Sequence, residues 1–174
     1  KEHQAATIQL DFQLPQRFEL EYQNEKDGYD TPIMIHRAIF GSVERFMALL
    51  IDHYGGKWPF WLSPRQAVVI PINDTHKEYA INVVKKLSNE PEDFDSATKL
   101  STNKFFVDLD DRSETIGFRT KDAISKGYNH IILVGDKEIE TNLLAIRSRS
   151  DRKIEKLSVD EIADKFRILE DKFQ

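Results

Sequence analysis

The sequence has no cysteine among its 174 residues, and it is poor in glycine and in long apolar runs. Without cysteine the chain offers no disulfide framework, no thiolate nucleophile and no cysteine ligand for zinc. No apolar run approaches the roughly 20 residues that a membrane span needs. No basic-then-apolar leader is visible, so we expect no secretion signal, and an intracellular, reducing compartment is compatible with the sequence. No glycine-rich turn joins a strand to a helix, which argues against a dinucleotide site.

An excess of positive charge is also absent. The formal net charge is −5 at pH 7, whereas proteins that bind nucleic acid through general electrostatics are usually basic. Any contact with nucleic acid must therefore be local. Hydrophobic residues make up 40% of the chain and charged residues 32%, a globular composition that excludes disorder and collagen-like repeats.

The first residues alternate between apolar and polar side chains, which predicts a strand over residues 6–13. Thr7 and Gln9 would share its polar face, where they could contact a small polar ligand or simply be half exposed. A polar surface loop is expected at residues 24–30, and a second extended run at residues 33–40.

A helix is predicted over residues 43–54, where apolar side chains recur at helical spacing after Ser42, a candidate N-cap. Both tryptophans fall in the connector at residues 55–66, which we expect to be packed rather than flexible because its large rings need partners. The domain boundary is placed here, giving domains 1–60 and 61–174.

The second domain alternates strands with helices, which indicates a three-layer α/β domain on a mostly parallel sheet. Thr75 is a possible cap for the first of these helices, and Ser158 begins a capping box before the last one. The last helix is expected to bury Ile162, Ala163, Phe166, Leu169 and Phe173. Strands are expected at residues 68–72, 105–109, 130–134 and 143–147, helices at 75–87 and 115–126, and an exposed loop at 89–103.

Few side chains suggest chemistry by themselves. His36 lies in an apolar strand and is either a structural histidine or a metal ligand, with no second ligand identifiable in the chain. Arg45 lies in the first turns of a helix, where it could bind an anion or belong to a solvated face. Arg147 and Arg149 form a local basic cluster that could contact nucleic acid or lie in a solvated turn.

Three longer stretches closely resemble the carboxy-terminal portion of threonyl-tRNA synthetases. They are residues 4–12, residues 34–46 with the sequence MIHRAIFGSVERF, and residues 55–64. Within the second stretch, Gly-Ser-x-Glu-Arg resembles the third signature motif of class II synthetases. The rest of the chain is similar to the anticodon-binding domain of that family, including GDKE at 135–138 and IRSR at 146–149.

The resemblance implies a fragment of the class II antiparallel catalytic sheet, followed by a three-layer α/β anticodon-binding domain with a five-stranded mixed sheet. It implies ATP-dependent activation of threonine and transfer to threonine tRNA, with Mg²⁺ accompanying the ATP. Arg45 would be the catalytic arginine that contacts ATP, and His36 one of three zinc ligands, the other two lying outside this chain. The residues that would line the threonine and ATP pocket are Gln4, Thr7, Gln9, Ser42 and Arg45.

The same resemblance places the anticodon contacts at Asp74, Lys121, Glu138 and Arg147. The expected partners are threonine tRNA, ATP and threonine, with a homodimer for the full-length enzyme and neither a membrane nor DNA as a partner. Ser113 and Gly127 stand where bacterial relatives use Asn and Arg on the anticodon, which favours a mitochondrial matrix enzyme over a cytoplasmic one.

Class II motifs one and two are missing, so the chain is expected to be a fragment that is inactive alone. Two other functions stay open from the sequence. One is a non-catalytic RNA-binding protein derived from a synthetase, and the other, which the absence of a glycine-rich loop disfavours, is a small-molecule-binding α/β module.

Overall fold

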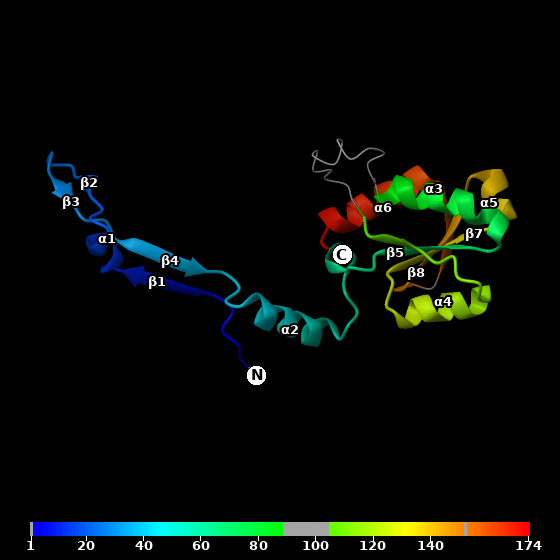
Figure 1. The fold of residues 1–174 in the computed structure, drawn as a ribbon, viewed down its shortest axis with the longest axis horizontal. Helices are drawn as coiled ribbons and strands as arrows, with labels where there is room; N and C mark the ends of the chain where they lie inside the picture. Colours follow the sequence, from blue (N-terminus) through cyan, green and yellow to red (C-terminus); the bar gives the residue numbers. More distant parts are fainter. Residues whose placement is uncertain (1, 89–104, 152) are drawn as a thin grey trace. The chain divides into compact units, whose positions relative to one another are not determined.

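The computed structural model describes residues 2–88, 105–151 and 153–174. The chain divides into two compact units, Lys1–His53 and Tyr54–Gln174 (Figure 1). The loop expected at residues 89–103 lies outside the described residues. Within the described ranges, no helix is long and apolar enough to cross a membrane.

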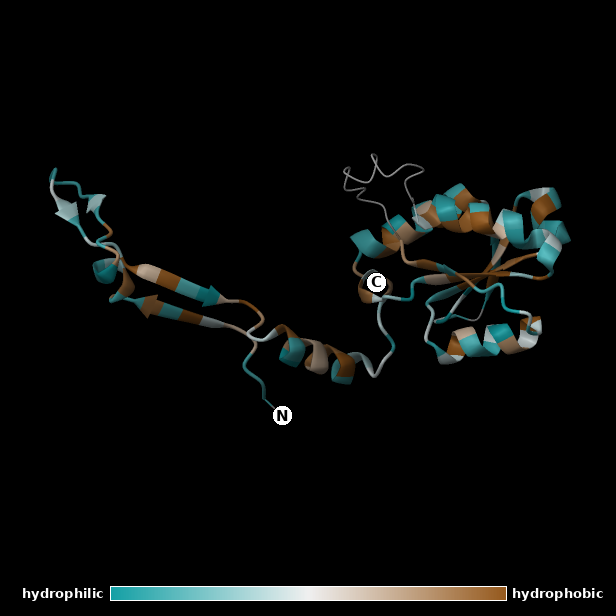
Figure 2. Cartoon of the chain, in the orientation of Figure 1, coloured by the Kyte–Doolittle hydropathy of each residue, from teal (hydrophilic) through white to brown (hydrophobic). Residues whose placement is uncertain are grey.

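The first unit is built on an antiparallel pair of strands. β1 (Thr7–Asp11) pairs with β4 (Met34–Ala38), and Gln9 lies directly opposite His36. Both strands fall within the stretches that the sequence pattern predicts to be extended. The other face of the pair is apolar and exposed, at Ile8, Leu10 and Ile35. Figure 2 shows hydrophobic residues along both strands.

Three short elements lie between these strands, namely α1 (Leu14–Arg17), β2 (Tyr22–Gln23) and β3 (Tyr29–Asp30). β2 and β3 form an antiparallel hairpin where the sequence predicted only a loop. The turn is held by Asn24, whose Oδ1 accepts hydrogen bonds from the N–H groups of Lys26 and Gly28, each at 2.9 Å. The hairpin is therefore held by an asparagine side chain in its turn. Its two-residue strands are too short to give an alternating pattern in the sequence.

The helix predicted over residues 43–54 is confirmed as α2 (Val43–Tyr54). Its start is capped by Ser42, whose Oγ accepts a hydrogen bond from the Arg45 N–H at 3.3 Å. It ends at Gly55 and Gly56, which have φ of +56° and +76°, a left-handed conformation that favours glycine. No residue of α2 is buried.

The second unit contains the expected five-stranded mixed sheet, in the order β6-β5-β7-β8-β9. The strand β5 is parallel to β6 and β7 on its two sides, while β8 and β9 continue the sheet in antiparallel fashion. Their bounds are β5 (Ala67–Pro71), β6 (Val107–Leu109), β7 (His130–Val134), β8 (Leu144–Ser148) and β9 (Ile154–Leu157).

Helices cover both faces of this sheet (Figure 1). On one face lie α3 (Lys77–Ser88), α5 (Asp136–Thr141) and α6 (Val159–Asp171), and on the other lies α4 (Ile116–Ser125). Along β5, Val69 packs into the larger core under α3 and α6, while Val68 and Ile70 pack into the smaller core under α4. A central strand buried on both faces reads as a continuous apolar run, which explains the sequence AVVIP.

The connector at residues 55–66 is packed, as its aromatic content predicted. Phe60, in a 3₁₀ turn at Phe60–Leu62, is buried with its ring centroid 4.7 Å from that of Phe166 in α6. The buried Gln66 side chain donates to the Phe60 carbonyl at 3.0 Å and accepts from the Phe106 N–H at 2.7 Å. These bonds fix the connector to the second unit.

Two details of the helix predictions are wrong. A 3₁₀ turn at Asp74–His76 precedes α3, and its cap is Asn73 rather than Thr75. Ser158 does cap α6, and Ile162 and Phe166 are fully buried, but Phe173 lies beyond the helix end and is 71% exposed. Its ring instead packs edge-on against Trp61, with centroids 5.3 Å apart.

Two further elements of the second unit, α5 and β9, were not predicted. Their sequences, DKEIET and IEKL, are short and contain several charged residues, so neither carries the apolar run that marks the predicted strands or the apolar spacing of a longer helix.

Candidate functional site

Three side chains expected to bind threonine or zinc project from one face of the β1–β4 pair. The register places Gln9 opposite His36 and Thr7 opposite Ala38. Residues directly opposite each other share a face of the sheet, as do alternate residues of one strand. Thr7, Gln9 and His36 therefore point to the same side, where they gather a hydroxyl, an amide and an imidazole.

The imidazole on this face is held by Asp11. Its Oδ1 accepts hydrogen bonds from the N–H groups of Gln13 at 2.9 Å and Leu14 at 3.0 Å, where α1 begins. Its Oδ2 lies 2.9 Å from Nε2 of His36. The bond from Leu14, followed by that from His36, lowers the pKa of Asp11 below its ordinary value. The carboxylate is thus ionised at neutral pH and oriented by both of its oxygens.

A hollow of about 670 Å³ lies at the start of α2 and gathers Gln4, Ser42 and Arg45. Phe40 and Phe46 also line it, with ring centroids 4.5 Å apart. Arg45 is exposed, and its guanidinium makes no ion pair within the described residues. A free guanidinium near a helix start, beside aromatic rings, suits an anionic ligand that carries a planar group.

In the second unit, two of the expected anticodon residues lie at the carboxyl edge of the sheet. Asp74 follows β5 and Glu138 follows β7, and these parallel strands are neighbours. His76 is buried, and its Nε2 lies 2.9 Å from Oδ1 of Asp136, which ties the two loops together. Glu138 is itself held, since its Oε2 accepts the Gly135 N–H at 3.1 Å. In open α/β sheets this edge is the usual place for a ligand.

The other two expected anticodon residues lie on the α4 side of the sheet. Arg147 on β8 is directly opposite Ile131 on β7, and Ile131 packs with Ala123 of α4 in the smaller core. Arg147 therefore faces the same side as α4, where Lys121 is exposed. The structure thus brings the four residues to two places, one at the carboxyl edge and one beside α4.

Arg147 lines a pocket of about 560 Å³ together with Lys57 and Arg149. Arg149 is occupied, because its guanidinium donates to the carbonyl oxygens of Gly127 at 2.9 Å and Trp58 at 2.6 Å. Burial lowers its pKa. Within the described residues, Arg147 and Lys57 make no ion pair, so they are the cations available to an anionic ligand.

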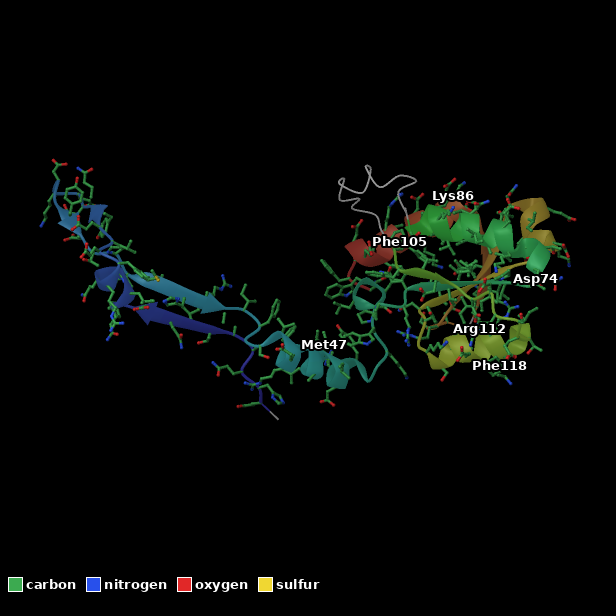
Figure 3. All side chains as sticks on the ribbon, viewed as in Figure 1. Met47, Asp74, Lys86, Phe105, Arg112 and Phe118 are labelled. Atoms are coloured by element: carbon green, nitrogen blue, oxygen red, sulfur yellow. The ribbon has the colours of Figure 1, made fainter. Side chains whose placement is uncertain are left out.

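Arg112 is a charged residue at the carboxyl edge that the sequence analysis did not single out. Its guanidinium donates to both oxygens of Asp110, each at 2.8 Å, and to Asp122 at 2.5 Å, and it lies 5.9 Å from the Phe118 ring centroid (Figure 3). It lines a pocket of about 270 Å³ with Asp74. The signal that could have found it is a run of charged residues directly after a strand, where the carboxyl edge of a parallel sheet falls.

Two family models match the chain, one on each unit. The class II core domain of tRNA synthetases (G, H, P, S and T) matches residues 1–54, and the anticodon binding domain matches residues 66–169. The mitochondrial threonine–tRNA ligase of Saccharomyces cerevisiae is 50% identical over 100% of this chain and 39% of its own length. The chain belongs to the threonyl-tRNA synthetase family.

Relatives of this family from other sources match as well. A probable cytoplasmic threonine–tRNA ligase of Dictyostelium discoideum is 43% identical over 100% of the chain, which spans 23% of that relative. The RNA binding domain structure of threonyl-tRNA synthetase from Cryptosporidium parvum superposes with a TM-score of 0.80 at 37% identity. That match covers 97% of this chain and 40% of the other. The chain therefore spans only a minor part of these relatives.

Membership in the threonyl-tRNA synthetase family confirms the fold expected from the resemblance. The face with Thr7, Gln9 and His36 and the hollow with Arg45 lie within the class II core match, and both groups of expected anticodon residues lie within the anticodon-binding match. The roles of the individual residues stay predictions.

Proposed function

We propose that the chain is part of a threonine–tRNA ligase, which activates threonine with ATP and transfers it to threonine tRNA. Residues 1–60 would complete the class II catalytic domain, and residues 61–174 would read the anticodon. The β1–β4 register carries this proposal, because it gathers Thr7, Gln9 and His36 on one face. The whole-chain similarity to threonine–tRNA ligases supports it.

In the first step the threonine carboxylate would displace pyrophosphate from the α-phosphate of ATP in line. Such a reaction needs positioning and positive charge rather than a protein nucleophile. Arg45 would supply the charge, from the hollow that it shares with Gln4 and Ser42. Mg²⁺ would enter with the nucleotide. The rings of Phe40 and Phe46 offer the adenine an apolar surface in the same hollow.

Zinc is the cofactor expected to select threonine, by binding its amino and hydroxyl groups. Within the described residues no three His, Asp or Glu side chains are grouped to hold a metal ion. This chain would therefore supply one ligand, His36, and the remaining ligands would come from sequence outside it. His36 fits the role, because one ring nitrogen is bonded to a carboxylate, an arrangement typical of metal-binding histidines. Thr7 and Gln9 would orient threonine from the same face.

The second unit would read the tRNA through its two groups of polar residues. Asp74 and Glu138 offer carboxylates at the carboxyl edge, which can accept hydrogen bonds from base amino groups. Lys121 and Arg147 offer cations on the α4 side, for phosphates or base edges. Because the chain is acidic as a whole, these local groups rather than general charge would decide recognition.

The 50% identity to a mitochondrial relative supports the mitochondrial matrix as the compartment, with the cytoplasm as the alternative. The full-length enzyme would act as a homodimer, with no membrane or DNA partner.

Threonine-dependent ATP–pyrophosphate exchange tests the proposal. We expect no exchange by this chain alone, and exchange once upstream sequence extends it to the length of its relatives. In the extended protein, Arg45→Ala should slow exchange by about 10²–10³-fold, the cost of losing one charge-stabilising donor. Arg37→Ala is the matched control, since Arg37 lies opposite Ile8 on the other face of the strand pair. Exchange by the chain alone, or an unaffected Arg45→Ala protein, would contradict the proposal.

A further inference from the structure

The carboxylate of Asp11 is more constrained than its place at the start of α1 requires. One oxygen accepts hydrogen bonds from the Gln13 and Leu14 N–H groups, which satisfies two backbone donors at the start of α1. The second oxygen is not left to solvent but lies 2.9 Å from Nε2 of His36, 25 residues away on the neighbouring strand. The Asp11 side chain is 19% exposed, so the contact is partly shielded from solvent.

An ionised carboxylate can only accept a hydrogen bond, so a neutral His36 must donate through Nε2. The proton on Nε2 leaves the lone pair on Nδ1, and within the described residues nothing donates a hydrogen bond to that nitrogen. The contact therefore selects one tautomer and one ring orientation.

We propose that Asp11 is a positioning residue that holds His36 in the tautomer whose Nδ1 binds zinc. This inference rests on the proposed function, which makes His36 a zinc ligand, and it adds the ligating atom and the residue that selects it. Asp11 lies on the same face as Thr7 and Gln9, two positions apart along β1. It therefore lies beside the two residues that are expected to line the threonine pocket.

The alternative role for Asp11 is purely structural, as a surface ion pair between β1 and β4. Exposed pairs of this kind contribute little to stability. The Nε2-protonated ring is compatible with either role, because the carboxylate accepts a hydrogen bond from Nε2 in both cases. Only a positioning role makes zinc affinity depend on Asp11, so the tautomer tests the contact and zinc affinity distinguishes the two roles.

The first test needs no metal. In the chain labelled with ¹⁵N on histidine, two-bond ¹⁵N–¹H correlation spectra at a pH where the ring is neutral should show His36 protonated at Nε2. Asp11→Asn keeps an oxygen for the Gln13 and Leu14 N–H groups but presents an amide donor to the ring, so the proton should move to Nδ1. Asp27→Asn, at an exposed carboxylate of the same unit, should change nothing. A native chain protonated at Nδ1 would overturn the inference without help from any variant.

The second test measures zinc affinity in the protein extended to the length of its relatives, by competition with a chromogenic chelator. Asp11→Asn should weaken zinc binding about 10–100-fold, the usual effect of removing such a partner. His36→Ala should abolish tight binding, and Asp27→Asn should leave it unchanged. If the unsubstituted protein binds no zinc, the proposed zinc site fails, and this inference fails with it. If that protein binds zinc and Asp11→Asn binds it equally well, this inference alone is overturned.

Discussion

Lowering the pH from 7 to 5 is expected to destabilise the second unit through His130. This imidazole lies against the rings of Phe60 and Phe166, with centroids 5.5 and 5.0 Å away. Burial, and after it the charge of Lys165, lowers the pKa of His130 from 6.5 to about 4. The unfolded state therefore takes up the proton first as the pH falls, so stability is lost progressively between pH 6.5 and pH 4. The loss amounts to about 3 kcal/mol in full and about 2 kcal/mol at pH 5.

Urea unfolding of the chain at pH 7 and pH 5, followed by circular dichroism, measures this effect. His130→Phe is the reference, because it keeps a ring at the same position but cannot take up a proton. Every other acid–base group is common to both proteins, so the difference between their pH dependences isolates His130. With a urea dependence of about 1–3 kcal/mol per M, the midpoint of the native chain should fall by roughly 1 M more than that of the variant. Equal shifts in the two proteins would refute the reasoning.

Two further changes test the carboxyl edge of the sheet. Gly135→Ala should lower the free energy of unfolding by about 1–3 kcal/mol, because an added Cβ would lie 2.5 Å from Cδ1 of Ile72. Gly117→Ala, whose added Cβ meets no atom within 4 Å, should leave it unchanged or raise it, and equal losses by urea unfolding would contradict the packing argument. His76→Ala should release the tie between the loops that carry Asp74 and Glu138. The variant should then bind threonine tRNA less tightly in filter binding, while its binding to an anticodon-replaced tRNA stays the same. An undiminished preference for the threonine anticodon would show that the His76–Asp136 contact does not position Asp74 and Glu138.

The sequence pattern predicts the strands that carry apolar or alternating runs, and it predicts the longer helices that have apolar spacing and a local cap. Ser42 and the apolar spacing after it define α2, and Ser158 with Glu161 defines the start of α6. The hairpin of β2 and β3 could not be found in this way, because Asn24 and backbone N–H groups hold it rather than an apolar pattern.

In the candidate site, too, local patterns place some residues and tertiary structure places the others. Alternation alone puts Thr7, Gln9 and Asp11 on one face, but only the strand register brings His36 to that face, next to Asp11. No local pattern links residues 25 positions apart, so this pair depends on tertiary structure. The sequence likewise does not show that Asp74 and Glu138 lie at the same edge of the sheet. They do so because β5 and β7 are adjacent and parallel.

The most direct test of the central claim is binding of this chain to threonine tRNA, compared with the same transcript carrying a replaced anticodon, at two salt concentrations. Both affinities should fall with salt, because phosphate contacts dominate binding to nucleic acid. Replacing the anticodon should cost upwards of about 1–3 kcal/mol at either salt concentration, the scale of a lost base contact. Equal binding of the two transcripts at both salt concentrations would contradict it.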